Sequence, residues 1–338
     1  MTGEGRGEGG DGTYEMNQTL FEKLIEPGPR LPWIKDWLLS EVWSCDRYSN
    51  SSRIDFLHKG EEEINLFESL ISSAASRIYD ELLSTTDPTK RLLNALSDSG
   101  TAVVVFDGLS IREIPIILTL AGKSGLKVSN VDSSLAALPS ETVDYIEREF
   151  PCGRIGPSQL QGRKELKGKG ISAIYHQNYG LALSGDYEGS PLLVWSSFPD
   201  CTYRDSGAKF ENHFENIHAF FETAWINTVQ QIKGKKRIIV TSDHGYIFFG
   251  SGMDFPRTSS SEQRELNDYF GNDRNVSLSE KPHPPQSDDV FIDTLHKVAM
   301  IKGRVKTKST GDAASRLYKH GGLSLMEMLV PWIEIEPV

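Results

Sequence analysis

Residues 238–245 read IIVTSDHG, a short β-branched run that ends in an acidic residue, a histidine and a glycine. Two other runs end in a similar way, AVVVFDG at 102–108 and LLVWSSFPD at 192–200. Short, fully apolar runs of this kind, alternating with helical stretches, indicate buried parallel strands. The three runs therefore predict an α/β domain whose strands each end at an aspartate.

A helical stripe lies between the second and third runs and supplies the crossover that a parallel pair of strands needs. Its apolar positions and one histidine recur at helical spacing: Phe214, Ile217, His218, Phe221, Trp225, Val229 and Ile232. Two further strands are predicted at 171–175, which read ISAIY, and at 329–335, which read LVPWIEI. The pattern as a whole predicts a mainly parallel central sheet with helices on its faces.

The chain before this domain has a different character. Residues 1–16 are rich in glycine and poor in apolar side chains, so we expect a disordered tail. Residues 17–96 are predicted to form a helical N-terminal region, interrupted at 27–32 by three prolines and a glycine. Its longest amphipathic helix is expected over 61–83, and no residue of this region points to chemistry.

The domain proper is predicted over 97–338, with loop or cap insertions near 151–190 and 251–312. Residues 151–170 are rich in Gly, Lys and Arg, and residues 251–289 are polar without a sustained apolar period. Segments of this composition are typical of surface loops or of a cap over a site.

Composition limits the protein's class and partners. The 338 residues are 38% apolar and 25% charged, with 47 acidic and 36 basic residues and a net charge of −11. This balance disfavours whole-surface binding to nucleic acid, although the basic clusters at 233–237 and 302–308 leave a local groove open. The chain has no apolar run long enough to cross a membrane and only three scattered cysteines, so we expect a cytoplasmic protein with reduced thiols.

The strand-end aspartates carry the first chemical signal. Ligand sites in open α/β sheets lie outside the carboxyl ends of the strands, where Asp107, Asp200 and Asp243 are expected. A single aspartate there is also common as a turn or cap residue. Three in register, with His244 directly after one of them, indicate a divalent-metal site, and Gly245 allows a sharp turn behind them.

Two more residues extend this signal. His320 precedes a glycine pair in YKHGGLSLMEM, from which its ring could project as a metal ligand, although a lone loop histidine is common. Thr142 in LPSET is most simply a helix N-cap, and the alternative is a metal-activated nucleophile at a helix N-terminus.

Taken together, VVVFDGLSIREIP, LPSET, VTSDHGYIF and YKHGGLSLMEMLVPWIEI resemble the PglZ domain of the alkaline phosphatase superfamily. The resemblance covers about residues 97–338, with the motifs in the family's order. It implies an alkaline-phosphatase-like three-layer sandwich, with two divalent ions, zinc or manganese, beside a threonine nucleophile.

Position by position, the resemblance assigns Asp107, Asp243 and His244 to one metal and Asp200 with His320 to the other, with Thr142 as nucleophile. The family pattern also expects a histidine a few residues after Asp200, where this chain has PDCTYRD. Arg204 stands near that place, so Asp205 or His213 would have to complete the second metal site, whereas His218 belongs to the apolar stripe. Alternatively, one metal binds and Arg204 supplies charge to the phosphate.

The function expected from these residues is metal-dependent hydrolysis of a phosphodiester, with a nucleotide or oligonucleotide as substrate. The resemblance also implies antiphage defence of the BREX type, with other defence proteins as partners and no membrane. Two alternatives stay open: a catalytically weakened scaffolding subunit of such a complex, and a hydrolase of an oligonucleotide messenger.

Overall fold

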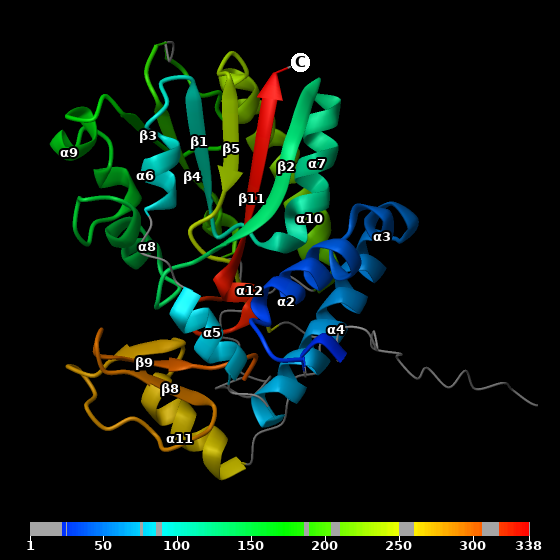
Figure 1. The fold of residues 1–338 in the computed structure, drawn as a ribbon, viewed down its shortest axis with the longest axis vertical. Helices are drawn as coiled ribbons and strands as arrows, with labels where there is room; N and C mark the ends of the chain where they lie inside the picture. Colours follow the sequence, from blue (N-terminus) through cyan, green and yellow to red (C-terminus); the bar gives the residue numbers. More distant parts are fainter. Residues whose placement is uncertain are drawn as a thin grey trace, which may run out of the picture.

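The computed structural model describes residues 22–24, 26–74, 77–85, 90–185, 189–203, 210–249, 260–305 and 318–337. A six-stranded sheet in the order β2-β11-β5-β1-β4-β3 forms its centre (Figure 1). The predicted tail over 1–16 lies outside the described residues.

Five of the six strands run parallel to one another, and only β11 is antiparallel to its neighbours β2 and β5. The strands are β1 (Thr101–Asp107), β2 (Leu126–Leu135), β3 (Ser172–His176), β4 (Leu192–Pro199), β5 (Arg237–Thr241) and β11 (Leu329–Pro337). The predicted strands at 102–106, 171–175, 192–198, 238–242 and 329–335 all belong to this sheet. The predicted α/β class with a mainly parallel sheet is confirmed.

Helices cover both faces of the sheet and make three layers (Figure 1). Alternate residues of β1 face opposite sides, so Val104 packs into one apolar cluster and Val103 into another. The first cluster includes side chains of α7 (Ile114–Lys123) and α10 (Phe210–Asn227). The second includes side chains of α6 (Arg91–Ala95), α8 (Thr142–Glu149) and α9 (Lys164–Lys167). The predicted crossover helix is α10, and a 3-10 turn over Val229–Ile232 follows it.

The N-terminal region is helical, as predicted. It contains α2 (Leu31–Trp37), which continues into a π-helical turn over Leu38–Val42, and then α3 (Cys45–Asn50), α4 (Arg53–Ala74) and α5 (Arg77–Thr85). The single helix expected over 61–83 is therefore two helices. Buried side chains of α2, α4 and α5 belong to the same apolar cluster as one face of the central sheet.

Residues 260–305 form a small unit of their own, where a loop or cap was expected. This inserted unit contains α11 (Ser260–Phe270) and a three-stranded antiparallel sheet of β7 (Asn275–Ser277), β9 (Val298–Ile301) and β8 (Val290–Asp293). A separate apolar cluster that includes Leu266, Phe270 and Ile301 holds it together. The unit lies beyond the carboxyl ends of β1 and β5 (Figure 1).

Three short elements lie between the main sheet and this region. β6 (Ile247–Phe248) pairs with β10 (Tyr318–Lys319), and α12 (Leu325–Met328) leads directly into β11. Within the described residues, no helix is long and apolar enough to cross a membrane. The three cysteines are free thiols.

Candidate metal centre

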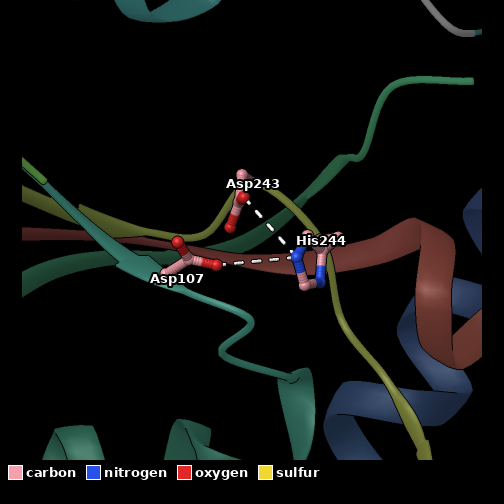
Figure 2. A group of neighbouring side chains, drawn as sticks. All are labelled: Asp107, Asp243 and His244. Carbon is pink, nitrogen blue, oxygen red and sulfur yellow. Dashed lines mark ion pairs between the residues drawn. The ribbon is translucent and has the colours of Figure 1, made fainter. Parts of the chain in front are cut away.

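Asp107 and Asp243 come together because β1 and β5 are neighbouring parallel strands. Asp107 is the last residue of β1, and Asp243 follows the end of β5 by two residues. Figure 2 shows both carboxylates turned toward the ring of His244. His244 Nε2 lies 3.6 Å from Asp107 Oδ1 and 3.6 Å from Asp243 Oδ2.

The imidazole of His244 is held by its other nitrogen. Nδ1 lies 3.0 Å from the carbonyl oxygen of Gly245, so in the neutral ring Nδ1 donates and Nε2 keeps its lone pair. The side chain is 1% exposed, while that of Asp107 is 13% exposed. Nε2 therefore faces the two carboxylates, on the side of the group where Asp107 is partly exposed.

One backbone and one side-chain hydrogen bond hold the two carboxylates. The N–H of Gly108 donates to Asp243 Oδ1 at 3.1 Å, and Trp195 Nε1 donates to Asp107 Oδ2 at 3.4 Å. Gly108 has a φ of +75° and lies against His244, Asp200 and Tyr203, so a larger residue would be strained and crowded there.

Burial and the neighbouring charges strongly shift the pKa values of this group. Burial, and then the nearby charge of Asp243, raise the pKa of Asp107 well above its usual value. Burial alone would lower the pKa of His244, but the charges of Asp243, Asp107 and Asp200 raise it to about 9. Three carboxylates thus act on one buried imidazole, which is an environment that favours a bound cation.

Thr142 belongs to the same group, although it lies far from Asp243 in the sequence. Its hydroxyl donates to Asp243 Oδ2 at 2.6 Å, across 101 residues of chain. The N-cap of α8 is Glu141, and no side chain caps this helix end. The interpretation of Thr142 as a helix N-cap is therefore wrong, since its hydroxyl is used by Asp243 and not by the backbone of the helix.

His320 is held over His244 by the LPSET turn. The two rings stack with centroids 3.9 Å apart. His320 Nδ1 lies 3.1 Å from Ser140 O and 3.5 Å from Glu141 Oε2. The hydroxyl of Ser140 accepts from Gly321 N–H at 2.9 Å and donates to Gly322 O at 3.0 Å, which ties the two turns together.

Asp200 begins the 3-10 turn that follows β4 and lines the same cavity as His320. Arg204 and Asp205 lie outside the described residues, as does the side chain of His213. His218 is half-buried on α10, near the charges of Arg53, Glu222 and Lys123, and does not belong to the group around Asp243. The structure thus brings together Asp107, Thr142, Asp243, His244 and His320, with Asp200 beside them.

Sequence reasoning missed Ser140, Glu141 and Trp195. Ser140 and Glu141 stood inside the quoted LPSET motif, and their polarity next to Thr142 was the available signal. Trp195 lies within a strand whose mostly apolar residues indicate only burial, so its role as a donor to Asp107 could not be predicted from the pattern.

Asp107, Asp243 and His244 fit a divalent ion. Their ligand atoms lie within 4.8 Å of one another, and among the described residues this is the one group of three that does so. Two carboxylate oxygens and an imidazole nitrogen form a donor set that zinc accepts, with room for further ligands, and manganese takes oxygen and nitrogen donors as well. In the neutral ring, Nε2 of His244 has the lone pair that a metal ligand needs.

No protein-family model matches this chain, and no curated protein matches it. Among solved structures, it is similar to murine ectonucleotide pyrophosphatase/phosphodiesterase 5, with 11% identity and a TM-score of 0.39 over 70% of this chain and 88% of that one. Phosphonoacetate hydrolase from Sinorhizobium meliloti 1021, in complex with phosphonoacetate, gives 11% identity and a TM-score of 0.35 over 69% and 89%. Human ectonucleotide pyrophosphatase/phosphodiesterase 5 gives 11% identity and a TM-score of 0.37 over 70% of this chain and 87% of that one.

Proposed function

We propose that this protein is a metal-dependent phosphohydrolase that cleaves phosphodiesters with Thr142 as nucleophile. The observation that carries the proposal is the hydrogen bond from the Thr142 hydroxyl to Asp243, at 2.6 Å, inside the group that fits a divalent ion. This hydrogen bond places the hydroxyl beside the carboxylates and the imidazole that would hold the ion.

Each residue has a defined part in this proposal. Asp107, Asp243 and His244 would hold one ion, and Asp200 and His320 would contribute to a second. A bound ion would lower the pKa of a nearby hydroxyl and offset the negative charge of the phosphate. Asp243 Oδ2 orients the Thr142 oxygen, and the positive end of the α8 dipole favours an anion at that position.

A nucleotide or oligonucleotide substrate, and a place in BREX-type defence beside other proteins, belong to the same proposal. They rest on the likeness of the four motifs to the PglZ domain. A cytoplasmic location rests on the free cysteines and on the composition of the chain.

Metal analysis and hydrolysis of bis-p-nitrophenyl phosphate test the proposal. Wild type should purify with, or take up, zinc or manganese and turn the diester over. Thr142→Ala should retain metal and lose about 1,000-fold or more in kcat, because the nucleophile is removed. Asp243→Asn should lose both metal and turnover. Thr223→Ala, an exposed threonine of α10, is the control and should behave as wild type.

The possible outcomes separate the alternatives. Full activity of Thr142→Ala would refute the nucleophile. Absence of bound metal and of turnover in the wild type would favour the scaffolding role over hydrolysis.

A further inference from the structure

A cavity of about 490 Å³ opens next to the proposed metal centre. Its lining includes Glu141, Asp200 and His320, which belong to the site itself. It also includes Asn272 and Asp273, which connect α11 to β7 in the inserted unit. A substrate with its phosphorus near Thr142 would therefore place one of its ester groups against the inserted unit.

The wall made by the inserted unit is held firmly in place. Buried Arg274 donates to Glu327 Oε1 at 2.7 Å and to the carbonyl oxygen of Val305 at 3.0 Å. Glu327 Oε1 also accepts from Gly322 N–H at 2.9 Å, in the turn that follows His320. Asn275 Nδ2 donates to Glu141 Oε1 at 2.9 Å. The wall and the turn that carries His320 are thus parts of one hydrogen-bonded network.

Among the described residues that line the cavity, carboxylates outnumber cationic side chains. Glu141, Asp200 and Asp273 contribute three carboxylates. The guanidinium of Arg274 is committed to Glu327, which leaves Lys319 as the other cation of the lining, with Nζ donating to Asn272 O. Even with Asp200 bound to a metal, Glu141 and Asp273 exceed Lys319 in charge. Among the described residues, no Lys or Arg pairs with the Asp273 carboxylate.

Carboxylates at a pocket wall accept hydrogen bonds from hydroxyl and ammonium groups and repel further anions. We propose that the cavity selects phosphodiesters whose ester group is cationic or neutral and rich in hydrogen-bond donors, and that Asp273 is a specificity-determining residue for this choice. The inference rests on the proposed phosphodiesterase activity and names the substrate class of that site. Esters whose group facing Asp273 carries additional negative charge are discriminated against, so among the proposed substrates the inference favours a nucleotide with an uncharged nucleoside on that side over an oligonucleotide.

A matched series of substrates tests the charge rule. The 2-aminoethyl, 2-hydroxyethyl and 2-carboxyethyl esters of p-nitrophenyl phosphate differ in the charge of one small group and share the reporter. At low ionic strength, wild type should show a kcat/KM about tenfold higher for the aminoethyl than for the carboxyethyl ester, since each screened charge pair changes binding by a few-fold. The hydroxyethyl ester should lie between them.

Substitutions at Asp273 locate the effect. Asp273→Asn should reduce the ratio about threefold, and Asp273→Lys should remove or reverse it, through KM more than through kcat. Glu265→Lys is the control, because it makes the same charge change on the exposed face of α11 outside the cavity lining, and it should leave the ratio unchanged.

The results distinguish the two proposals. Hydrolysis of all three esters at equal rates, or a ratio that Asp273→Lys does not alter, would overturn the specificity inference while leaving the hydrolase intact. If metal-loaded wild type hydrolysed none of the three esters, the proposed function itself would be overturned. Loss of the charge preference at high salt should accompany the expected result, since the wall is open to solvent.

Discussion

Gly245 lies beneath the backbone of α12, in the turn directly after His244. Its N–H donates to Glu327 O at 2.9 Å, and a Cβ at this position would overlap the carbonyl oxygen of Met326. Its φ is not among the positive values, so the expected sharp glycine turn is not the reason for this residue. The close approach of another backbone is the reason, and it fixes the distance between His244 and α12.

Gly245→Ala should therefore lower the free energy of unfolding by about 2–3 kcal/mol, because a backbone atom cannot give way as a flexible side chain can. Gly122→Ala is the control: it lies in α7 with nothing within 4 Å of the added carbon, and should be neutral or stabilising by up to about 1 kcal/mol. Urea denaturation of both variants and wild type measures the effect. Equal stability of Gly245→Ala and wild type would contradict the steric argument.

Residue by residue, the strand-end aspartates and His244 could be read from the sequence because strand ends meet at one edge of a sheet. Thr142 could not be read with the same certainty, since a threonine before a helix satisfies a local rule and its actual partner is 101 residues away. Ser140 and Glu141 contact the ring of His320 and the backbone of the two glycines after it, and no local sequence pattern predicts such contacts.

Among the helices, α4 carries a buried glutamate that keeps its proton to a higher pH than an exposed glutamate does. Glu68 accepts from Leu325 N–H at 2.7 Å, and burial raises its pKa to about 7. Burial likewise raises the pKa of Glu113, in the 3-10 turn after β1, to about 7. In the unfolded chain a glutamate loses its proton near its ordinary pKa of 4.5. The folded protein thus binds more protons than the unfolded chain between about pH 4.5 and 7.

The free energy of unfolding should accordingly fall as pH rises through that window. Glu68→Gln keeps an acceptor for Leu325 and cannot ionise. Between pH 5 and pH 8 its free energy of unfolding should therefore fall by roughly 2 kcal/mol less than that of wild type. Glu63→Gln, at a partly exposed glutamate of the same helix that pairs with Arg47, serves as control. Urea denaturation at the two pH values gives the differences, and identical losses for wild type and Glu68→Gln would rule out a neutral Glu68.

Among the strands, predictability follows burial. The strands β1, β4 and β5 are almost wholly buried, and continuous apolar runs indicate such strands well. The sequence LKVSNVDSSL of β2 is mostly exposed or half-buried at the edge of the sheet, so its polar residues concealed a ten-residue strand. The inserted unit was equally hidden, because its small core draws on few apolar residues scattered over a polar stretch.

For the molecule as a whole, the boundary predicted near residue 96 does not coincide with a boundary in packing. Apolar residues of α2, α4 and α5 share one cluster with the central sheet. A buried ion network reinforces this union: Glu61 of α4 pairs with Arg112, which follows β1, and with Arg304 of the inserted unit. One carboxylate therefore joins three segments that are far apart in sequence.

Glu61 tests whether these segments fold together. Burial would raise its pKa, but the charges of Arg112 and Arg304 lower it, so it is ionised at neutral pH. Glu61→Gln removes the carboxylate charge that pairs with both buried guanidinium groups, and it should lower the free energy of unfolding by about 3–5 kcal/mol. Glu63→Gln is the matched control, because it removes a carboxylate of the same helix that pairs with Arg47 at a partly exposed site. It should lower the free energy of unfolding by about 0–1 kcal/mol.

Urea denaturation followed by far-UV circular dichroism gives these costs, and hydrogen exchange compares the opening free energies of α4 and β1. We expect Glu61→Gln to lower both free energies together, in a single transition, because the helices and the sheet bury one common apolar cluster. If α4 opened in an earlier, separate step while β1 kept its wild-type protection, the N-terminal helices would be an independent domain. Glu61 would then be a docking contact between domains, and loss of that contact would leave the metal centre at the carboxyl edge of the sheet intact.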